Sequence, residues 1–249
     1  MEAVIDPLDA PDWLREVPLA HRGLHDAERP ENSLPAFAAA AAAGYGVELD
    51  VYLSRDEVPV IAHDASLARV AGLDRRIGQL TAAELRAVRL GDTDAHVPTL
   101  AESLEVLRDV PVMVELKSTR PRAGRLEERT AEVLDEHAGP YCVASFNPVA
   151  VKWFLDHRPD VVRVQTATAR HEGWLSAAIG RRLAELRDLG KVRPHAVSYD
   201  LQSLPHPAPE AWRAAGGVLV TWTAVGEAGL ARGRTVADNV IFEDVLPER

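Results

Sequence analysis

Short apolar runs rich in β-branched residues alternate with longer helical patterns along nearly the whole chain of 249 residues. We predict eight strands, at residues 17–21, 46–53, 111–117, 141–145, 161–166, 196–199, 217–222 and 238–242. Helices are predicted between most of them, at residues 33–43, 100–108, 124–137, 148–157, 173–189, 209–215 and 225–232. Such alternation is typical of parallel βαβ units. It favours a single (β/α)₈ barrel of the TIM type, with residues 1–249 forming one domain.

Two departures from a regular barrel are expected. Residues 53–64 read as a hairpin with its turn near Asp56 and Glu57 and a return strand at 58–63. A two-residue turn would place Asp50 opposite His63. Residues 65–98 would then form a small insertion after the second strand, at the mouth of the barrel. The residues after the last strand are too few for a full eighth helix, so that helix is predicted to be truncated.

An acidic face is predicted on the second strand. Glu48 and Asp50 alternate with the apolar residues Val47, Leu49 and Val51, so both carboxylates point to one side of the strand. Burying two carboxylates is very costly unless a cation or strong donors satisfy them. A metal site is therefore the most economical interpretation.

Further polar residues are expected on the same rim, at the C-terminal ends of the strands, where barrel enzymes place their catalytic groups. These are His21 and Arg22 at the C-terminal end of the first strand, Glu115 and Lys117 on the third, and His63 from the hairpin. Three carboxylates (Glu48, Asp50 and Glu115) favour a hard cation, Mg²⁺ or Ca²⁺. Arg22 and Lys117 suit a phosphate, and His21 and His63 suit acid–base chemistry. The predicted reaction is metal-assisted phosphodiester hydrolysis.

Several motifs occur in an order that matches a known family. They are His21-Arg22-Gly23, Pro30-Glu31-Asn32-Ser33, Glu48-Leu49-Asp50-Val51, Pro59-Val60-Ile61-Ala62-His63-Asp64, Glu115-Leu116-Lys117 and Val220-Thr221-Trp222-Thr223. Together they resemble the glycerophosphodiester phosphodiesterase family. The resemblance implies a (β/α)₈ barrel that hydrolyses glycerophosphodiesters to glycerol 3-phosphate and an alcohol with a divalent metal.

The resemblance also implies roles for individual residues. Glu48, Asp50 and Glu115 would bind the metal, and His21 and His63 would be the catalytic acid–base pair. Arg22 and Lys117 would bind phosphate, and Trp222 would line the substrate pocket. Glu57 departs from the family pattern, because the hairpin turn usually carries glycine there. Helix capping and loop anchoring are the expected roles of Glu31 and Asn32, with a contact to the site as the alternative. His195 is expected to be structural.

Other functions remain open at this stage. One is a lysophospholipase D-type hydrolysis of larger lipid diesters, which would need an apolar mouth from Leu67, Val70, Leu73 and Ile77 of the insertion. Another is a barrel that binds phosphoryl ligands without turnover. A metal-dependent sugar isomerase would carry more histidine ligands and would lack the Arg22–Lys117 pair.

Composition limits the partners and the location. The formal net charge of −10 argues against a nucleic-acid partner or binding to an anionic membrane. The N-terminus lacks the pattern of a secretory signal, and the longest apolar run, residues 34–44, is too short to span a bilayer. We expect a cytoplasmic protein without stable membrane insertion, acting on a small glycerophosphodiester; a homo-oligomer stays open. The single cysteine, Cys142, is expected in the core.

Overall fold

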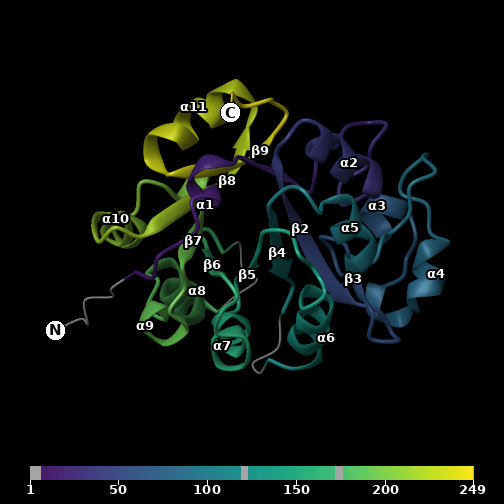
Figure 1. Cartoon of the computed structure of the whole chain (residues 1–249), viewed down its shortest axis with the longest axis horizontal. Helices are drawn as coiled ribbons and strands as arrows, with labels where there is room; N and C mark the ends of the chain where they lie inside the picture. The colour runs from purple at the N-terminus through teal and green to yellow at the C-terminus, as the bar shows by residue number, and fades with distance from the viewer. Residues whose placement is uncertain (1–6, 119–122, 172–175, 249) are drawn as a thin grey trace. The chain divides into compact units, whose positions relative to one another are not determined.

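The computed structural model describes residues 7–118, 123–171 and 176–248. The chain divides into two compact units, residues 19–141 and residues 1–18 with 142–249. Their helices and strands are labelled in Figure 1. Across the described residues, eight strands run parallel and alternate with helices, which is the predicted (β/α)₈ barrel class. That residues 1–249 form a single domain stays a prediction.

The unit of residues 19–141 holds three of the parallel strands. β1 (Leu19–His21) pairs with β2 (Gly46–Leu53), and β2 pairs with β4 (Val112–Leu116). β3 (Pro59–Ile61) lies antiparallel to β2. The helical segments of this unit are α2 (Leu34–Ala42), α3 (Ala68–Ala71), the 3₁₀ turn η1 (Ile77–Gln79), α4 (Ala82–Arg86), α5 (Leu100–Val106) and α6 (Arg125–Leu134).

The other unit carries the remaining five strands in sequential parallel pairing. They are β5 (Tyr141–Ser145), β6 (Arg163–Ala167), β7 (Ala196–Asp200), β8 (Val218–Val225) and β9 (Asn239–Glu243). Its helical segments are α1 (Trp13–Glu16), α7 (Pro148–His157), α8 (Ala177–Ala184), α9 (Leu189–Val192), η2 (Leu201–Ser203), α10 (Pro207–Ala214) and α11 (Gly226–Val236). The helix expected at 173–189 therefore ends earlier than predicted, and its first residues lie outside the described ones. Residues 244–248 contain no helix, as expected. Cys142 is fully buried in β5.

Local sequence explains where the elements next to the acidic strand begin and end. Ser33 caps α2 by accepting a hydrogen bond from the amide of Ala36, and Gly44 ends the helix region with a φ of +75°. Gly46 opens β2 where a Cβ would lie 2.9 Å from the carbonyl oxygen of Pro111. Glycine thus lets β2 approach the segment leading into β4.

The β2–β3 hairpin is present, but its predicted register is wrong by one residue. Val51 lies opposite Ile61, and the amide of Ala62 donates to the carbonyl of Asp50 at 3.0 Å. Asp50 therefore faces Ala62 and not His63. The reason is the turn, which has three residues rather than two and ends on Glu57 with a φ of +62°. Sequence periodicity alone does not reveal this extra residue.

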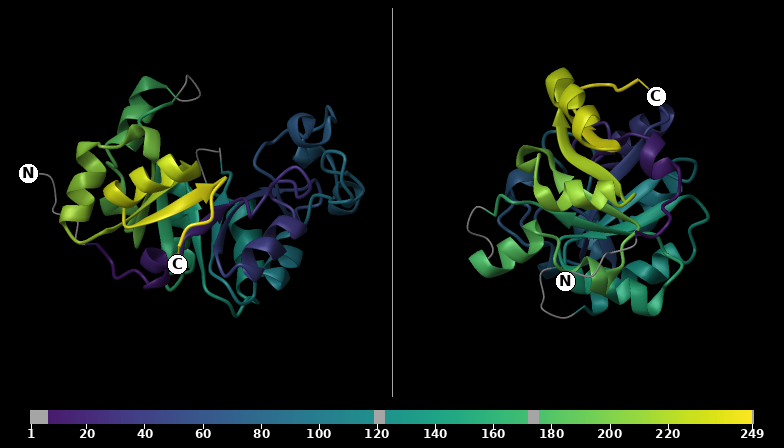
Figure 2. Two further views of the ribbon diagram at one scale, coloured as in Figure 1. Left: turned by 90° about the horizontal axis from the view of Figure 1, so that it is seen from above. Right: turned by 90° about the vertical axis from the view of Figure 1, so that its left-hand side faces the viewer.

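The insertion at 65–98 builds a small apolar core against the hairpin. Its members include Leu67, Ile77, Leu85, Leu90 and Val97, all buried, together with Val60 of β3. A capping box opens α4: the amide of Thr81 donates to the side chain of Glu84, and the amide of Glu84 donates to the hydroxyl of Thr81. In Figure 2 the insertion (blue) lies to one side of the strands of its own unit.

Candidate active site

The predicted acidic face is present, and β4 extends it. Glu48 and Asp50 are 3% and 1% exposed, and Asp50 lies directly across from Glu115 in the β2–β4 register. One ligand oxygen from each of the three carboxylates lies within 4.8 Å of the others. Parallel neighbouring strands thus bring together side chains that are 67 residues apart in sequence. This spacing is compatible with three oxygens on a single cation.

Glu48 carries the observation that bears most directly on a cation. No described residue donates a hydrogen bond to its buried Oε2, and the Nε2 of His21 lies 3.8 Å away. Burial raises the pKa of Glu48 well above its usual value, and the charges of Asp50 and Glu115 add to that shift. A buried carboxylate oxygen without a donor is costly. A hard divalent cation would satisfy it, so the residues present fit the metal that the sequence predicts.

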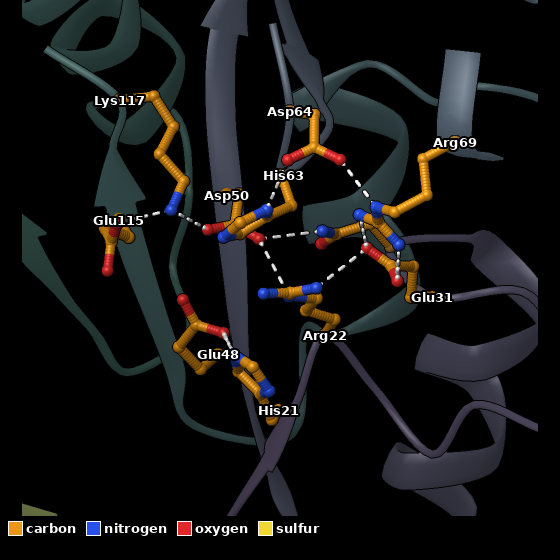
Figure 3. A network of polar contacts seen from close by, with 11 residues as sticks. His21, Arg22, Glu31, Glu48, Asp50, His63, Asp64, Arg69, Glu115 and Lys117 are labelled. Carbon is orange, nitrogen blue, oxygen red and sulfur yellow. Dashed lines mark hydrogen bonds and ion pairs between the residues drawn. The ribbon is translucent and has the colours of Figure 1, made fainter. Parts of the chain in front are cut away.

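Lys117 lies between two of these carboxylates (Figure 3). Its Nζ is 2.6 Å from Oδ1 of Asp50 and 2.5 Å from Oε1 of Glu115. Burial alone would lower the pKa of Lys117, but the surrounding carboxylates outweigh it and the pKa is raised. The side chain therefore keeps its positive charge inside the site. Its predicted contact with phosphate stays a prediction.

The end of β1 supplies two further groups. His21 lies across from Glu48 in the β1–β2 register. Arg22 adopts a φ of +57°, and its amide donates to the carbonyl of Glu48 at 2.8 Å. The guanidinium of Arg22 then reaches the site, with Nε 3.5 Å from Oδ2 of Asp50. Both residues lie beside the acidic face, as predicted.

His63 reaches the site from just beyond the end of β3 (Figure 3). Its Nδ1 is 2.8 Å from Oδ1 of Asp64. Burial lowers the pKa of His63 and the charge of Lys117 lowers it further, against the opposing effect of Asp50. The one-residue change in register does not remove His63 from the site, because this residue lies outside the paired part of the strand.

Some residues of the site were missed or assigned a lesser role. Asn32 donates from Nδ2 to Oδ2 of Asp50 at 2.8 Å, and Glu31 accepts from Nη1 of Arg22 at 2.9 Å. Both make the site contact that was the alternative to capping, while Ser33 is the cap. Asp64 and Arg69 were not singled out. A carboxylate next to a candidate base is a common orienting group, so the position of Asp64 beside that base could have indicated its role. No feature of the sequence indicated Arg69.

Trp222 lies on β8, in the other unit. Its ring packs edge-on against Phe146, with 5.5 Å between ring centroids. Its predicted place in the substrate pocket stays a prediction.

Comparison with known proteins gives the chain a family. The sequence model of the glycerophosphoryl diester phosphodiesterase family matches residues 21–172, more than half of the chain. The chain belongs to this family. Every predicted site residue except Trp222 lies within the matched segment. No helix among the described residues has the length and apolar character needed to cross a membrane.

Relatives of this phosphodiesterase-family chain match it over parts of their length. A probable glycerophosphodiester phosphodiesterase 2 of Mycobacterium tuberculosis is 37% identical over 103 residues, 41% of this chain and 39% of that one. The lysophospholipase D GDPD1 of Rattus norvegicus is 31% identical over 112 residues, 40% of this chain and 35% of that one. The matched segments thus span well under half of these relatives.

Solved structures match the chain over most of its length. A phosphodiesterase of Oleispira antarctica, in complex with the product sn-glycerol-3-phosphate, has a TM-score of 0.77 and 26% identity, covering 91% of this chain and 92% of that one. A glycerophosphodiester phosphodiesterase of Thermotoga maritima has a TM-score of 0.68 and 28% identity, covering 90% and 92%. Both matches agree with the barrel class described above.

Proposed function

We propose that the chain is a metal-dependent glycerophosphodiester phosphodiesterase that releases glycerol 3-phosphate and an alcohol. The observation that carries the proposal is the buried carboxylate group of Glu48, Asp50 and Glu115, in which Glu48 has an oxygen without a donor among the described residues. Family membership and the product bound by the Oleispira antarctica phosphodiesterase support the substrate class.

The carboxylates would hold the cation, Mg²⁺ or Ca²⁺, which would neutralise charge on the phosphoryl oxygens and so ease the attack of the nucleophile on phosphorus. Arg22 and Lys117 supply further positive charge for the phosphodiester. One of His21 and His63 takes the proton of the nucleophile, and the other protonates the leaving alkoxide. The nucleophile is water or the 2-hydroxyl of the substrate's own glycerol.

The insertion favours a small diester over a lipid. Of the four apolar residues that could line a lipid mouth, Leu67 and Ile77 are fully buried in the insertion's own core and Val70 packs against it. Leu73 is 37% exposed. Side chains committed to a core do not offer the continuous apolar surface that an acyl chain needs. A lysophospholipase D-type activity is therefore the second candidate.

The test measures glycerol 3-phosphate released from glycerophosphocholine by purified protein in EDTA, Mg²⁺ or Ca²⁺. We expect release that requires a cation and is lost in Glu48→Gln. Glu127→Gln is the matched control, because Glu127 is equally buried but caps α6. Faster turnover of lysophosphatidylcholine would favour the lipid activity, and no turnover of either substrate would contradict the proposal.

A further inference from the structure

Arg69 joins two carboxylates that are far apart in sequence. It lies on α3 of the insertion, and its Nε donates to Oδ2 of Asp64 at 2.6 Å. Its Nη1 and Nη2 donate to the two oxygens of Glu31 at 2.6 and 2.8 Å. The fork of a guanidinium is suited to such paired contacts, which fix direction as well as charge.

Each carboxylate also contacts a group of the candidate active site. Asp64 contacts Nδ1 of His63 at 2.8 Å through its other oxygen. Glu31 accepts from Nη1 of Arg22 at 2.9 Å. The contacts form a continuous path from His63 through Asp64, Arg69 and Glu31 to Arg22 (Figure 3).

The ionisation of the two carboxylates on this path determines which nitrogen of His63 carries the proton. Burial would raise the pKa values of Asp64 and Glu31. Hydrogen bonds and charges, with Arg69 as a main contributor, outweigh burial, so both pKa values are lowered. An ionised carboxylate can only accept hydrogen bonds. Nδ1 of His63 must therefore donate to Asp64, which leaves Nε2 as the nitrogen for proton transfer.

Arg69 lies outside the apolar core of the insertion. Its side chain is 49% exposed, whereas the neighbouring Leu67 is fully buried and anchors α3 in the insertion's core. Replacing Arg69 therefore removes polar contacts without opening a cavity.

We propose that Arg69 is a positioning residue that holds His63, through Asp64, and Arg22, through Glu31, in their working orientations. This inference rests on the proposed phosphodiesterase function. It assigns the insertion a part in the reaction without a contact to substrate.

The first test compares Arg69→Gln, Arg69→Lys and wild type on glycerophosphocholine with saturating cation. We expect kcat/KM to fall about 10- to 100-fold in Arg69→Gln, the range found when orienting groups are removed. Arg69→Lys should recover little, because one ammonium cannot reproduce the forked contacts. Arg86→Gln is the matched control, since Arg86 also lies on the insertion and pairs with a surface carboxylate, Glu102; it should match wild type.

The second test separates the two arms of the path. Asp64→Asn should mainly lower kcat, Glu31→Gln should mainly raise KM, and Arg69→Gln should do both. A purely structural brace would not produce this split. In the double variant Arg69→Gln/Asp64→Asn, kcat should fall no further than in the more impaired single variant, because both changes break one connection.

The outcomes distinguish the inference from the function. Wild-type kinetics in Arg69→Gln, or losses that multiply in the double variant, would overturn the role of Arg69 and leave the phosphodiesterase function standing. A wild-type protein without turnover would overturn both. If Arg69→Gln is unfolded at the assay temperature, Arg69→Lys decides by the same split between kcat and KM.

Discussion

Glu48 and Asp50 are two residues apart on one face of one strand, yet their environments differ sharply. Burial would raise the pKa of both. For Asp50 the charges of Lys117, His63 and Arg22 outweigh burial and lower the pKa, and Asn32 adds a hydrogen bond. For Glu48 burial has the largest effect and the charges of Asp50 and Glu115 add to it, so its pKa is raised despite Lys117 and Arg22. In the proposed function, Glu48 is therefore the carboxylate that a cation would stabilise most.

Removing either candidate acid–base residue should reduce the chemical step. We expect His21→Ala and His63→Ala each to lower kcat by about 10²- to 10⁴-fold, the usual contribution of general acid–base catalysis. The measurement is steady-state turnover of glycerophosphocholine, with circular dichroism to confirm folding. Turnover within a few-fold of wild type in either variant would remove that histidine from the proposed pair.

His195 should make stability depend on pH. Burial, with the charge of Arg163, lowers its pKa to about 4, and its Nδ1 accepts a hydrogen bond from the amide of Arg163 at 3.1 Å. Because the folded-state pKa is depressed, its contribution is complete above the unfolded value of about 6.5 and is lost as pH falls toward 4. The slope from this group cannot exceed about 1.4 kcal/mol per pH unit.

Urea unfolding between pH 7 and pH 4 measures this effect. His195→Asn keeps an acceptor for the amide and should flatten the pH dependence in that range. His157→Asn, at the exposed end of α7, is the control and should keep the wild-type slope. An unchanged slope in His195→Asn would show that other groups set the pH dependence.

At the level of single residues, the sequence predicts the polar site residues that alternate with apolar ones along a strand or lie at the end of a strand. Glu48, Asp50 and Glu115 follow from period-two alternation, and the structure brings them together. Arg69 could not be predicted, because its partners Glu31 and Asp64 meet it only after the insertion folds back over the hairpin. Contacts made by an irregular segment leave no periodic trace in the sequence.

At the level of elements, the β2–β3 turn combines backbone strain with surface charge. Glu57 has a φ of +62°, a conformation that costs energy for a residue with a Cβ. Arg125 of α6 pairs with its carboxylate, and Arg129 donates to its carbonyl at 3.3 Å. Exposed pairs of this kind contribute little on average.

Glu57→Gly should therefore raise the melting temperature, because relief of the strained backbone outweighs the loss of the exposed pair. Glu57→Gln keeps the strain and loses the charge, so it should melt slightly below wild type. Differential scanning calorimetry at moderate salt measures both. A lower melting temperature in Glu57→Gly than in Glu57→Gln would show that the pair with Arg125 dominates.

The same turn shows where element-level prediction ends. The strands and most helices follow from apolar periodicity and capping residues, such as Ser33 and Thr81. The register of a hairpin depends on the number of residues in its turn. Because a glutamate occupies the turn position where glycine is favoured, the sequence did not indicate a third turn residue. The predicted register therefore placed Asp50 opposite the wrong residue of the hairpin.

At the level of the whole molecule, cation binding should stabilise the folded chain. A ligand at about 100 times its Kd adds about 2.7 kcal/mol, which corresponds to an increase of about 5 to 10 °C in the melting temperature of a chain this size. We expect this shift with Mg²⁺ or Ca²⁺ relative to EDTA. It should disappear in Asp50→Asn and persist in Glu127→Gln; equal shifts in both variants would contradict the assigned ligands.

Cys142 is the chain's single thiol, and it lies fully buried in β5. A reagent such as a maleimide should find no accessible target on the native protein. A cysteine introduced at the exposed Leu73, just past α3, would then carry a fluorophore or spin label at one known position. The molecule is thus suited to spectroscopy that follows the insertion when a cation or a glycerophosphodiester is added.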